Sequence, residues 1–592
     1  METTVSVGQV VTDLEWLHEC CSVRRLRDGA KWAAEMLYNL DEQQQQQSSA
    51  STVPQEQPPQ RTTHSERLHA PVPCGAVRFA LTLIDCGEFA RAAALTERLA
   101  AADRNDADAF DVFVHYYALY LAGEKQKLDS MADVGDKKMQ FANNQLGVIR
   151  AALERRCAVA VTQEAHAATS ADGATPDPFL CYLYGVVLRD LQLTDEARRA
   201  LVTAIGAAPS FWPAWALLAK VIDSKTQLMQ LILPNHWLKP LFVCECYIRL
   251  QMASDATELY AQLNETAAMA GSSYVLSQTA VAFYNEQNYD KALELFSASH
   301  ERDRYRLEHL DLYSNTLFVK NMRVELSVLA HHCFELNKYS PETCIVVGNY
   351  YSLRREHERA VCYFQRALKL DPTNVGAWIL MGHEFMELKN TAAACLAYHN
   401  ALENDKNDFR AWNGLGQMYD ILRMPSHAIY YYNQAHKCRP TDSRMLIAIG
   451  DMYQKHNKTD RAMKCYWKAH CVGDIEGTAL LQLARLFEKE FDQAQAASCY
   501  LKFLAELATQ NAEDPVNAPL CYRFLAGYFI DQKRLDDAHK YAQLCLEFDA
   551  TKEDGKALLK RVSQARNIDC NAERSPSLSA ALGDDSSMMI ME

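Results

Sequence analysis

The sequence predicts an all-α protein, built as a solenoid of antiparallel helix pairs. Two observations carry that prediction. Small and large apolar residues recur at a fixed interval of 34 residues over much of the chain, and turn-forming residues are scarce, with 22 Gly and 18 Pro among 592 residues. A chain of this length is too long for one compact core. Scarce Gly and Pro favour long helices over many short strands.

The interval is clearest at Trp378 and Trp412, which stand 34 residues apart. Four positions after each comes a small residue, and the column that contains it reads Ala280, Ser314, Gly348, Gly382, Gly416, Gly450 and Ala484. Position 20 of each unit gives Ala292, Leu326, Ala360, Ala394, Ala428, Ala462 and Ala496, and position 24 gives Phe296, Ala330, Phe364, Tyr398, Tyr432, Tyr466 and Tyr500. Positions 4, 7, 8 and 11 share one helical face, as do positions 20, 24 and 27. The pattern is typical of the tetratricopeptide repeat (TPR), in which small residues at positions 8 and 20 let two helices approach.

Composition divides the chain into five expected parts. They are an N-terminal helical segment at 1–41, a disordered Gln/Pro-rich linker at 42–71, an N-terminal TPR half at 72–270, a C-terminal TPR superhelix at 271–569 and a disordered acidic tail at 570–592. The linker and tail are polar and have little to bury. Ser575 precedes a proline in the tail, which is the pattern of a proline-directed phosphorylation site.

Several function classes are disfavoured. The formal net charge of -14 argues against nucleic acid as the main partner. No apolar run approaches the ~18 residues of a membrane span, so we expect no membrane partner. We also expect no cofactor and no metal. His331, His332 and Cys333 are consecutive, and consecutive helical side chains point roughly 100° apart instead of converging on one ion. With no catalytic motif present, the chain is not expected to be an enzyme.

Function is therefore expected in the concave groove of the solenoid, where positions 2, 5, 9 and 12 of each first helix face inward. Asp420 and Asp451 are carboxylates from consecutive repeats that can hold a guanidinium. The expected peptide-binding residues are Asn349, His383, Glu384, Asn413, Gln417, Asp420 and Asp451, with apolar contacts from Ile345, Ile379 and Ile447. Such a groove suits a short extended peptide that carries Arg and an aliphatic residue. The alternative is that these acids are merely solvated, as in any wet groove.

Residues 348–455 match one family in exposed as well as packing positions. The matching segments include GNYYSLRREHERAVCYFQRALKLDP, GAWILMGHEFMELKNTAAACLAYHNALE and RAWNGLGQMYDILRMPSHAIYYYNQAHKCRP, with LYGVVLRDLQL at 183–193 and DKALELF at 290–296 further towards the N-terminus. The chain resembles subunit eight of the anaphase-promoting complex, or cyclosome, of the cell-division-cycle-twenty-three type. The Gln-rich insert and the tail depart from the family pattern.

The resemblance implies a non-catalytic scaffold subunit of a ubiquitin ligase that marks mitotic regulators, acting in the nucleus and cytoplasm. It implies a homodimer formed through the N-terminal repeats, contacts with other TPR subunits, and a C-terminal groove that receives an Arg-containing box of a coactivator of the Cdc-twenty/Cdh-one class. The alternative is a TPR adaptor of another assembly. A chaperone adaptor would need a carboxylate-clamping Lys where this chain has Ile345. Only the family resemblance argues against a motor-cargo adaptor.

Overall fold

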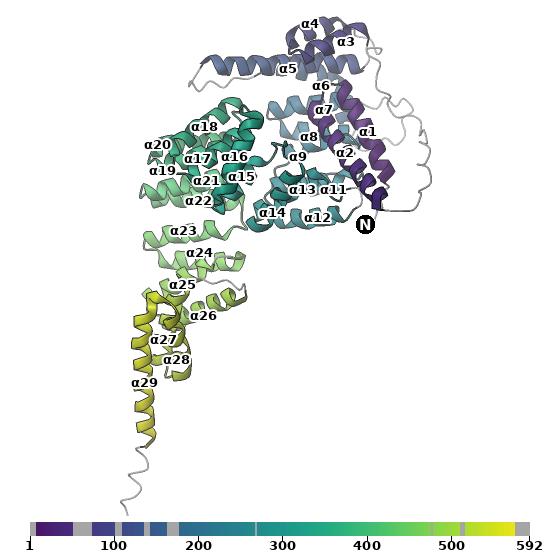
Figure 1. Ribbon diagram of the computed structural model, residues 1–592. Coiled ribbons are helices and arrows are strands. Elements are labelled where there is room, and N and C mark those ends of the chain that lie inside the picture. The colour runs from purple at the N-terminus through teal and green to yellow at the C-terminus, as the bar shows by residue number, and fades with distance from the viewer. Residues whose placement is uncertain are drawn as a thin grey trace, which may run out of the picture. The chain divides into compact units, whose positions relative to one another are not determined.

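A computed structural model describes residues 7–50, 74–100, 109–134, 143–162, 177–266, 269–474, 477–509 and 516–574. Every regular element in these ranges is an α-helix except two short 3-10 turns, which confirms the predicted all-α class (Figure 1). The helices form two compact units, Met1–Leu336 and Asn337–Glu592. None of the described helices is both long and apolar enough to cross a membrane.

The first unit begins with a helix pair and continues as further pairs. Its helices are α1 (Val7–Val23), α2 (Arg27–Ala50), α3 (Gly75–Asp85), α4 (Phe89–Ala100), α5 (Ala109–Val134), α6 (Leu146–Thr162), α7 (Pro178–Asp190), α8 (Thr194–Ala207), α9 (Trp212–Val221), α10 (Lys225–Gln230), α11 (Leu238–Arg249), α12 (Ala253–Glu265), α13 (Ser273–Glu286), α14 (Tyr289–Arg302), α15 (Leu310–Val319) and α16 (Arg323–Asn337). The expected boundary at 270/271 is wrong, because α13 packs against α2 and α11 and so belongs with the helices before it.

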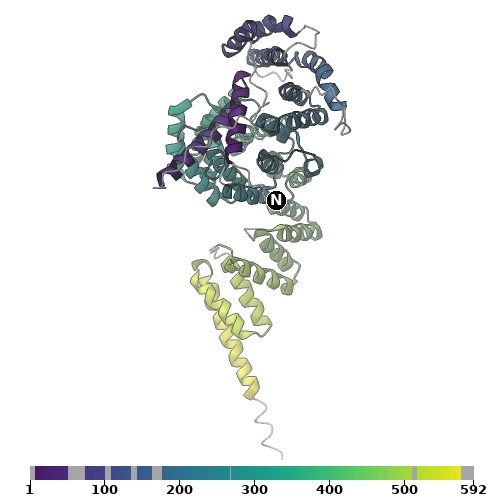
Figure 2. The same ribbon diagram turned by 90° about the vertical axis from the view of Figure 1, so that its right-hand side faces the viewer.

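The second unit is a regular stack of pairs that ends in one long helix. Its elements are α17 (Pro341–Leu353), α18 (His357–Leu370), α19 (Val375–Glu387), α20 (Thr391–Asn404), α21 (Phe409–Ile421), α22 (Pro425–Cys438), α23 (Ser443–Lys455), α24 (Thr459–Val472), α25 (Thr478–Lys489), α26 (Gln493–Thr509), α27 (Ala518–Asp531), α28 (Leu535–Leu544), the 3-10 turns η1 (Cys545–Glu547) and η2 (Asp549–Thr551), and α29 (Lys552–Arg574). Each pair contacts the next in chain order, which is visible as the passage from green to yellow in Figure 2.

Two expected disordered segments begin later than composition suggested. Residues 42–50 continue α2, and residues 570–574 continue α29. The rest of the Gln/Pro-rich tract lies outside the described residues, as does the tail from Ser575 onward. In α2, the run of Gln residues has good helix propensity and extends a helix that tertiary contacts already hold.

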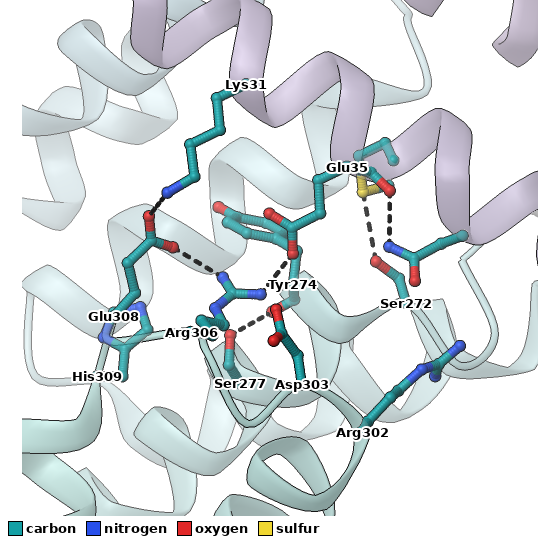
Figure 3. A network of polar contacts seen from close by, with 12 residues as sticks. Lys31, Glu35, Ser272, Tyr274, Ser277, Arg302, Asp303, Arg306, Glu308 and His309 are labelled. Atoms are coloured by element: carbon teal, nitrogen blue, oxygen red, sulfur yellow. Dashed lines mark hydrogen bonds and ion pairs between the residues drawn. The ribbon is translucent and has the colours of Figure 1, made fainter. Parts of the chain in front are cut away.

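Helix α2 packs against α9 and α13 of its own unit. The Trp32 ring stacks on Trp212 with ring centroids 4.8 Å apart, and it meets Tyr274 edge to face. Beyond this aromatic cluster, Arg306 forms ion pairs with both Glu35 and Glu308, and Lys31 pairs with Glu308 (Figure 3). The N-terminal segment is thus an integral part of the first unit.

The packing columns predicted from the 34-residue interval are buried. Position 20 is fully buried in all seven units, and position 24 is at most 5% exposed. At position 8, the backbone of the first helix lies very close to the second helix of the same pair. A Cβ atom built on Gly382 would lie 2.5 Å from Cε1 of Tyr398, and one on Gly450 would lie 2.6 Å from Cε1 of Tyr466. Glycine at position 8 therefore makes room for the aromatic ring at position 24 of the same pair.

In the seven units of the 34-residue register, the turn inside each pair places a residue other than glycine in the left-handed region. Gln287, Asn321, Arg355, Lys389, Arg423, Asn457 and Phe491, which stand 34 residues apart, have φ between 57° and 70°. The residue that follows each one donates its backbone N–H to a carbonyl in the last turn of the first helix, as Asn288 does to Phe283 at 3.0 Å. These bonds satisfy carbonyl groups at the helix end.

We predict that Gly382→Ala destabilises the α19–α20 pair by about 1–3 kcal/mol, because the methyl group overpacks the Tyr398 ring. Native-state hydrogen exchange of α19 and α20 measures this loss. Gly527, within α27, is the matched control because a Cβ there meets nothing within 4 Å. Gly527→Ala should stabilise its helix by about 0.5–1 kcal/mol. Unchanged protection in Gly382→Ala would contradict the packing account.

Candidate peptide-binding groove

The groove residues of the second unit stand on the first helices of successive pairs. Their N-termini are fixed by side-chain caps. Asp408 accepts the backbone N–H of Arg410 at 2.8 Å, and Asp442 accepts that of Arg444 at 3.1 Å. Both arginines also pair with the same carboxylates through their guanidinium groups, at 2.7 Å and 3.0 Å. Burial would raise the pKa of Asp408, but Arg410 and the cap bonds lower it overall. Arg410 and Arg444 therefore stabilise the N-terminal ends of α21 and α23 by pairing with the cap residues.

The tyrosines at position 24 reach from the core to the groove. The Tyr398 hydroxyl lies 2.9 Å from Nδ1 of His383, and the Tyr466 hydroxyl donates to Asp451 at 2.6 Å. The Tyr500 hydroxyl likewise donates to Glu488 at 2.7 Å. Each ring packs against a small position-8 residue while its hydroxyl holds a side chain at position 9 or 12.

His383 is consequently not a cationic or freely available groove residue. Burial and the nearby Arg410 charge lower its pKa to about 4, so the imidazole is neutral at physiological pH. The expected role of His383 in peptide binding is therefore limited to the contacts of a neutral imidazole that is held by the Tyr398 hydroxyl.

Asp420 and Asp451, from consecutive repeats, both interact electrostatically with Lys455. Asp420 forms an ion pair with Lys455 at 2.5 Å. Burial raises the pKa of Asp451. Tyr466 and Lys455 oppose that rise, while the charge of Asp420 adds to it. Since the Asp420 charge acts on Asp451, the two carboxylates share one electrostatic site, and Lys455 is the cation within it.

Asn413, Gln417 and Asp420 lie on one face of α21, at intervals of four and three residues. Gln417 is exposed, and Asn413 and Asp420 are half-buried. The Tyr432 ring packs below against Gly416. Burial, followed by the charges of Asp420 and Asp451, raises the pKa of Tyr432. This open cluster of Gln417, Asp420, Tyr432, Asp451 and Lys455 is hereafter the Asp420 cluster.

Two other predicted groove residues are buried. Asn349 is 2% exposed and Glu384 is 6% exposed. Glu384 accepts hydrogen bonds from Ser352 Oγ at 2.6 Å and from His357 Nδ1 at 2.7 Å, so it links α17, α18 and α19. The expectation that Glu384 lines an open groove is wrong, because its carboxylate is used to join two neighbouring pairs.

The apolar contacts expected from Ile345 and Ile379 are also wrong. These side chains are 1% and 3% exposed and belong to the core between pairs. Only Ile447 is half-buried. Position 5 was expected to face the groove. At Ile345 and Ile379, neighbouring helices pack closely and cover the side chain.

Sequence reasoning missed Lys455 and the tyrosine hydroxyls. Lys455 stands one position beyond the inward-facing set, at the last residue of α23. The tyrosines were assigned to packing alone, although Tyr instead of Phe at a buried position signals a hydroxyl that needs a partner. Among His331, His332 and Cys333, the two histidines contact different backbone carbonyls and Cys333 is buried. His331 Nδ1 lies 2.7 Å from its own helix's Ser327 carbonyl, and His332 Nε2 lies 2.9 Å from the Arg304 carbonyl.

Comparison with known proteins identifies the family. The family model of anaphase promoting complex subunit 8 / Cdc23 matches residues 9–280. Anaphase-promoting complex subunit 8 of Arabidopsis thaliana is 34% identical over 410 residues, which cover 63% of this chain and 67% of that protein. The subunit 8 of Dictyostelium discoideum is 42% identical over 219 residues, covering 37% of each chain. Cell division cycle protein 23 homolog of Homo sapiens is 41% identical over 226 residues, covering 38% of this chain and 35% of that protein. The chain belongs to the anaphase-promoting complex subunit 8 / Cdc23 family.

Proposed function

We propose that this chain is a non-catalytic scaffold subunit of the anaphase-promoting complex, acting in the nucleus and cytoplasm. Its membership of the subunit 8 / Cdc23 family is the observation that carries the proposal. Repeated helix pairs in both units support it, because a solenoid offers extended surfaces to other proteins. In this role it forms a homodimer through its first unit and contacts other TPR subunits, while other subunits perform the ubiquitin transfer.

Co-expression of two differently tagged copies of the full chain tests the assembly. Purification through one tag should retrieve the other copy together with further subunits of the complex, as identified by mass spectrometry. Retrieval of the subunits without the second copy would remove the homodimer and leave the scaffold role standing. Retrieval of chaperones or motor proteins in place of the complex would favour the adaptor alternative.

Within this role, we propose that the Asp420 cluster receives an arginine from a coactivator segment. Lys455 is 54% exposed and Asp420 is 28% exposed, so the ion pair between them sits at the groove surface. An ammonium group is a point charge, whereas a guanidinium can engage a carboxylate with two parallel hydrogen bonds. An incoming arginine can therefore displace Lys455 and gain a second carboxylate neighbour in Asp451.

Substitutions of the two members of the Asp420–Lys455 ion pair should change the peptide affinity in opposite directions. Asp420→Ala should weaken binding of an Arg-containing coactivator peptide by roughly 10- to 30-fold, because a charge-assisted pair is lost. Lys455→Met should strengthen it by roughly 3- to 10-fold, because the competing cation is gone. Fluorescence anisotropy of a labelled peptide measures both, and circular dichroism checks the fold.

Glu387 provides the control, since it is exposed and stands on α19, which carries none of the residues of the Asp420 cluster. Glu387→Ala should bind the peptide as the wild type does. If Asp420→Ala and Lys455→Met both match the wild type, the acids of this groove are simply solvated.

A further inference from the structure

The first unit encloses a second, separate candidate site. A pocket of about 490 Å³ lies between α2 and the helices α5, α7, α9 and α13. That volume is in the range of pockets that hold small ligands or a few side chains. Helices α7, α9 and α13 are the first helices of their pairs, the ones whose faces solenoids use for peptides.

The pocket has an aromatic and apolar lining. Tyr117, Tyr182 and Trp212 line it together with Trp32, which stacks on Trp212 at a centroid distance of 4.8 Å. The apolar lining residues are Leu26, Leu183, Val186, Ala216 and Leu217. Because Trp32 is packed between Trp212 and Trp237, this wall is held in place before any ligand arrives.

Four cationic side chains line the same pocket, and two of them, Arg189 and Lys220, stand on α7 and α9. Arg189 donates through Nε and Nη2 to one oxygen of Asp190, at 2.9 Å and 2.7 Å, and Tyr120 donates to the other oxygen at 2.9 Å. Asp190 is thereby occupied. Lys220, one helix pair further along, forms no hydrogen bond or ion pair with any residue that the structure describes.

The two charges that act most strongly on Lys220 are both positive. Desolvation lowers the pKa of Lys220, and the charges of Arg189 and Arg249 lower it further, against the weaker opposing charges of Glu245 and Asp28. Lys220 lines the pocket with an exposed side chain, so an anion can reach its ammonium group from solvent.

The carboxylates on the opposite wall do not supply that anion. Glu35 is paired with Arg306, and Glu308 is paired with both Arg306 and Lys31 (Figure 3). Asp28 is exposed and, among the described residues, has no ion-pair partner. Its charge offsets part of the positive field, but it forms no ion pair with Lys220. The wall shown in Figure 3 is therefore close to neutral toward an incoming anion.

We propose that this pocket binds an anionic side chain of a protein partner, with its carboxylate or phosphate between Lys220 and Arg189 and an adjoining apolar group against Tyr182 and Trp212. Two donor groups of like charge recognise the anion. The aromatic wall selects for a ring or a branched aliphatic group beside it. This site is independent of the Asp420 cluster, because the partner segment it takes is acidic and that of the second unit is basic.

Small probes with the same two features test the pocket on the full chain. Isothermal titration calorimetry with phenylacetate and phenyl phosphate should show saturable binding with a dissociation constant on the order of 1 mM or tighter. The neutral analogue phenylacetamide should bind at least about 10-fold more weakly. Binding of phenyl phosphate alone identifies a phosphorylated side chain as the natural source, and binding of phenylacetate alone identifies Asp or Glu.

Variants of Lys220 separate this site from general surface binding. Lys220→Met should weaken both anions by about 10-fold, whereas Lys220→Arg should keep binding within about 3-fold of the wild type. Lys239 is the matched control, a half-buried lysine of α11 that does not line the pocket. Lys239→Met should leave affinity unchanged. The proposal is overturned if neither anion binds, if phenylacetamide binds equally well, or if Lys220→Met binds like the wild type.

Discussion

The close approach of two helices within each pair is the constraint on which the structure of the second unit depends. It is set where an aromatic ring at position 24 lies against a position-8 residue that has no side chain. Tyr398 is in fact confined from two sides, because a Cβ on Gly382 or on Gly414 of the next pair would lie within 2.6 Å of its Cε1. One ring therefore fixes both the spacing within its own pair and the contact with the following pair. The same packing of a position-24 ring against a position-8 glycine recurs at Gly348, Gly416 and Gly450, and it sets the spacing of these successive pairs in the stack.

The same tyrosines couple the core to the groove. A buried phenol hydroxyl is costly without a hydrogen-bond partner, and in these pairs the partner is a groove side chain. His383 and Asp451 are positioned in this way by Tyr398 and Tyr466. These two side chains are thus held by the elements that also stabilise the helix pair. In the first unit, the aromatic stack around Trp32 holds α2 in place.

The sequence predicted those parts of the structure that a helical period encodes. The fold class and the buried columns follow from residues that share one helical face. Glu384 shows where that reasoning ends, because its burial depends on His357 and Ser352, which stand on two other helices. The prediction that Ile345 and Ile379 line the groove was wrong for the same reason, because their burial also depends on neighbouring helices. The left-handed turns were also out of reach, since residues such as Lys389 and Phe491 carry no glycine signal and adopt positive φ because the pair geometry imposes it. Residues 42–50 were misjudged because a polar Gln run can extend a helix that other residues already anchor.

The pKa of Asp451 is the measurement that tests most directly whether the packing tyrosines set the chemistry of the groove. Carbon-13 NMR of the labelled aspartate carboxyl groups measures it in the wild type and in Tyr466→Phe. The wild-type pKa should lie above the usual range, because burial and the Asp420 charge outweigh the Tyr466 hydrogen bond and Lys455. Removing the hydroxyl should raise it further, since a hydrogen bond to the ionised form is lost while the ring remains. A wild-type value in the ordinary range, or one that Tyr466→Phe leaves unchanged, would contradict the link between the core and the groove.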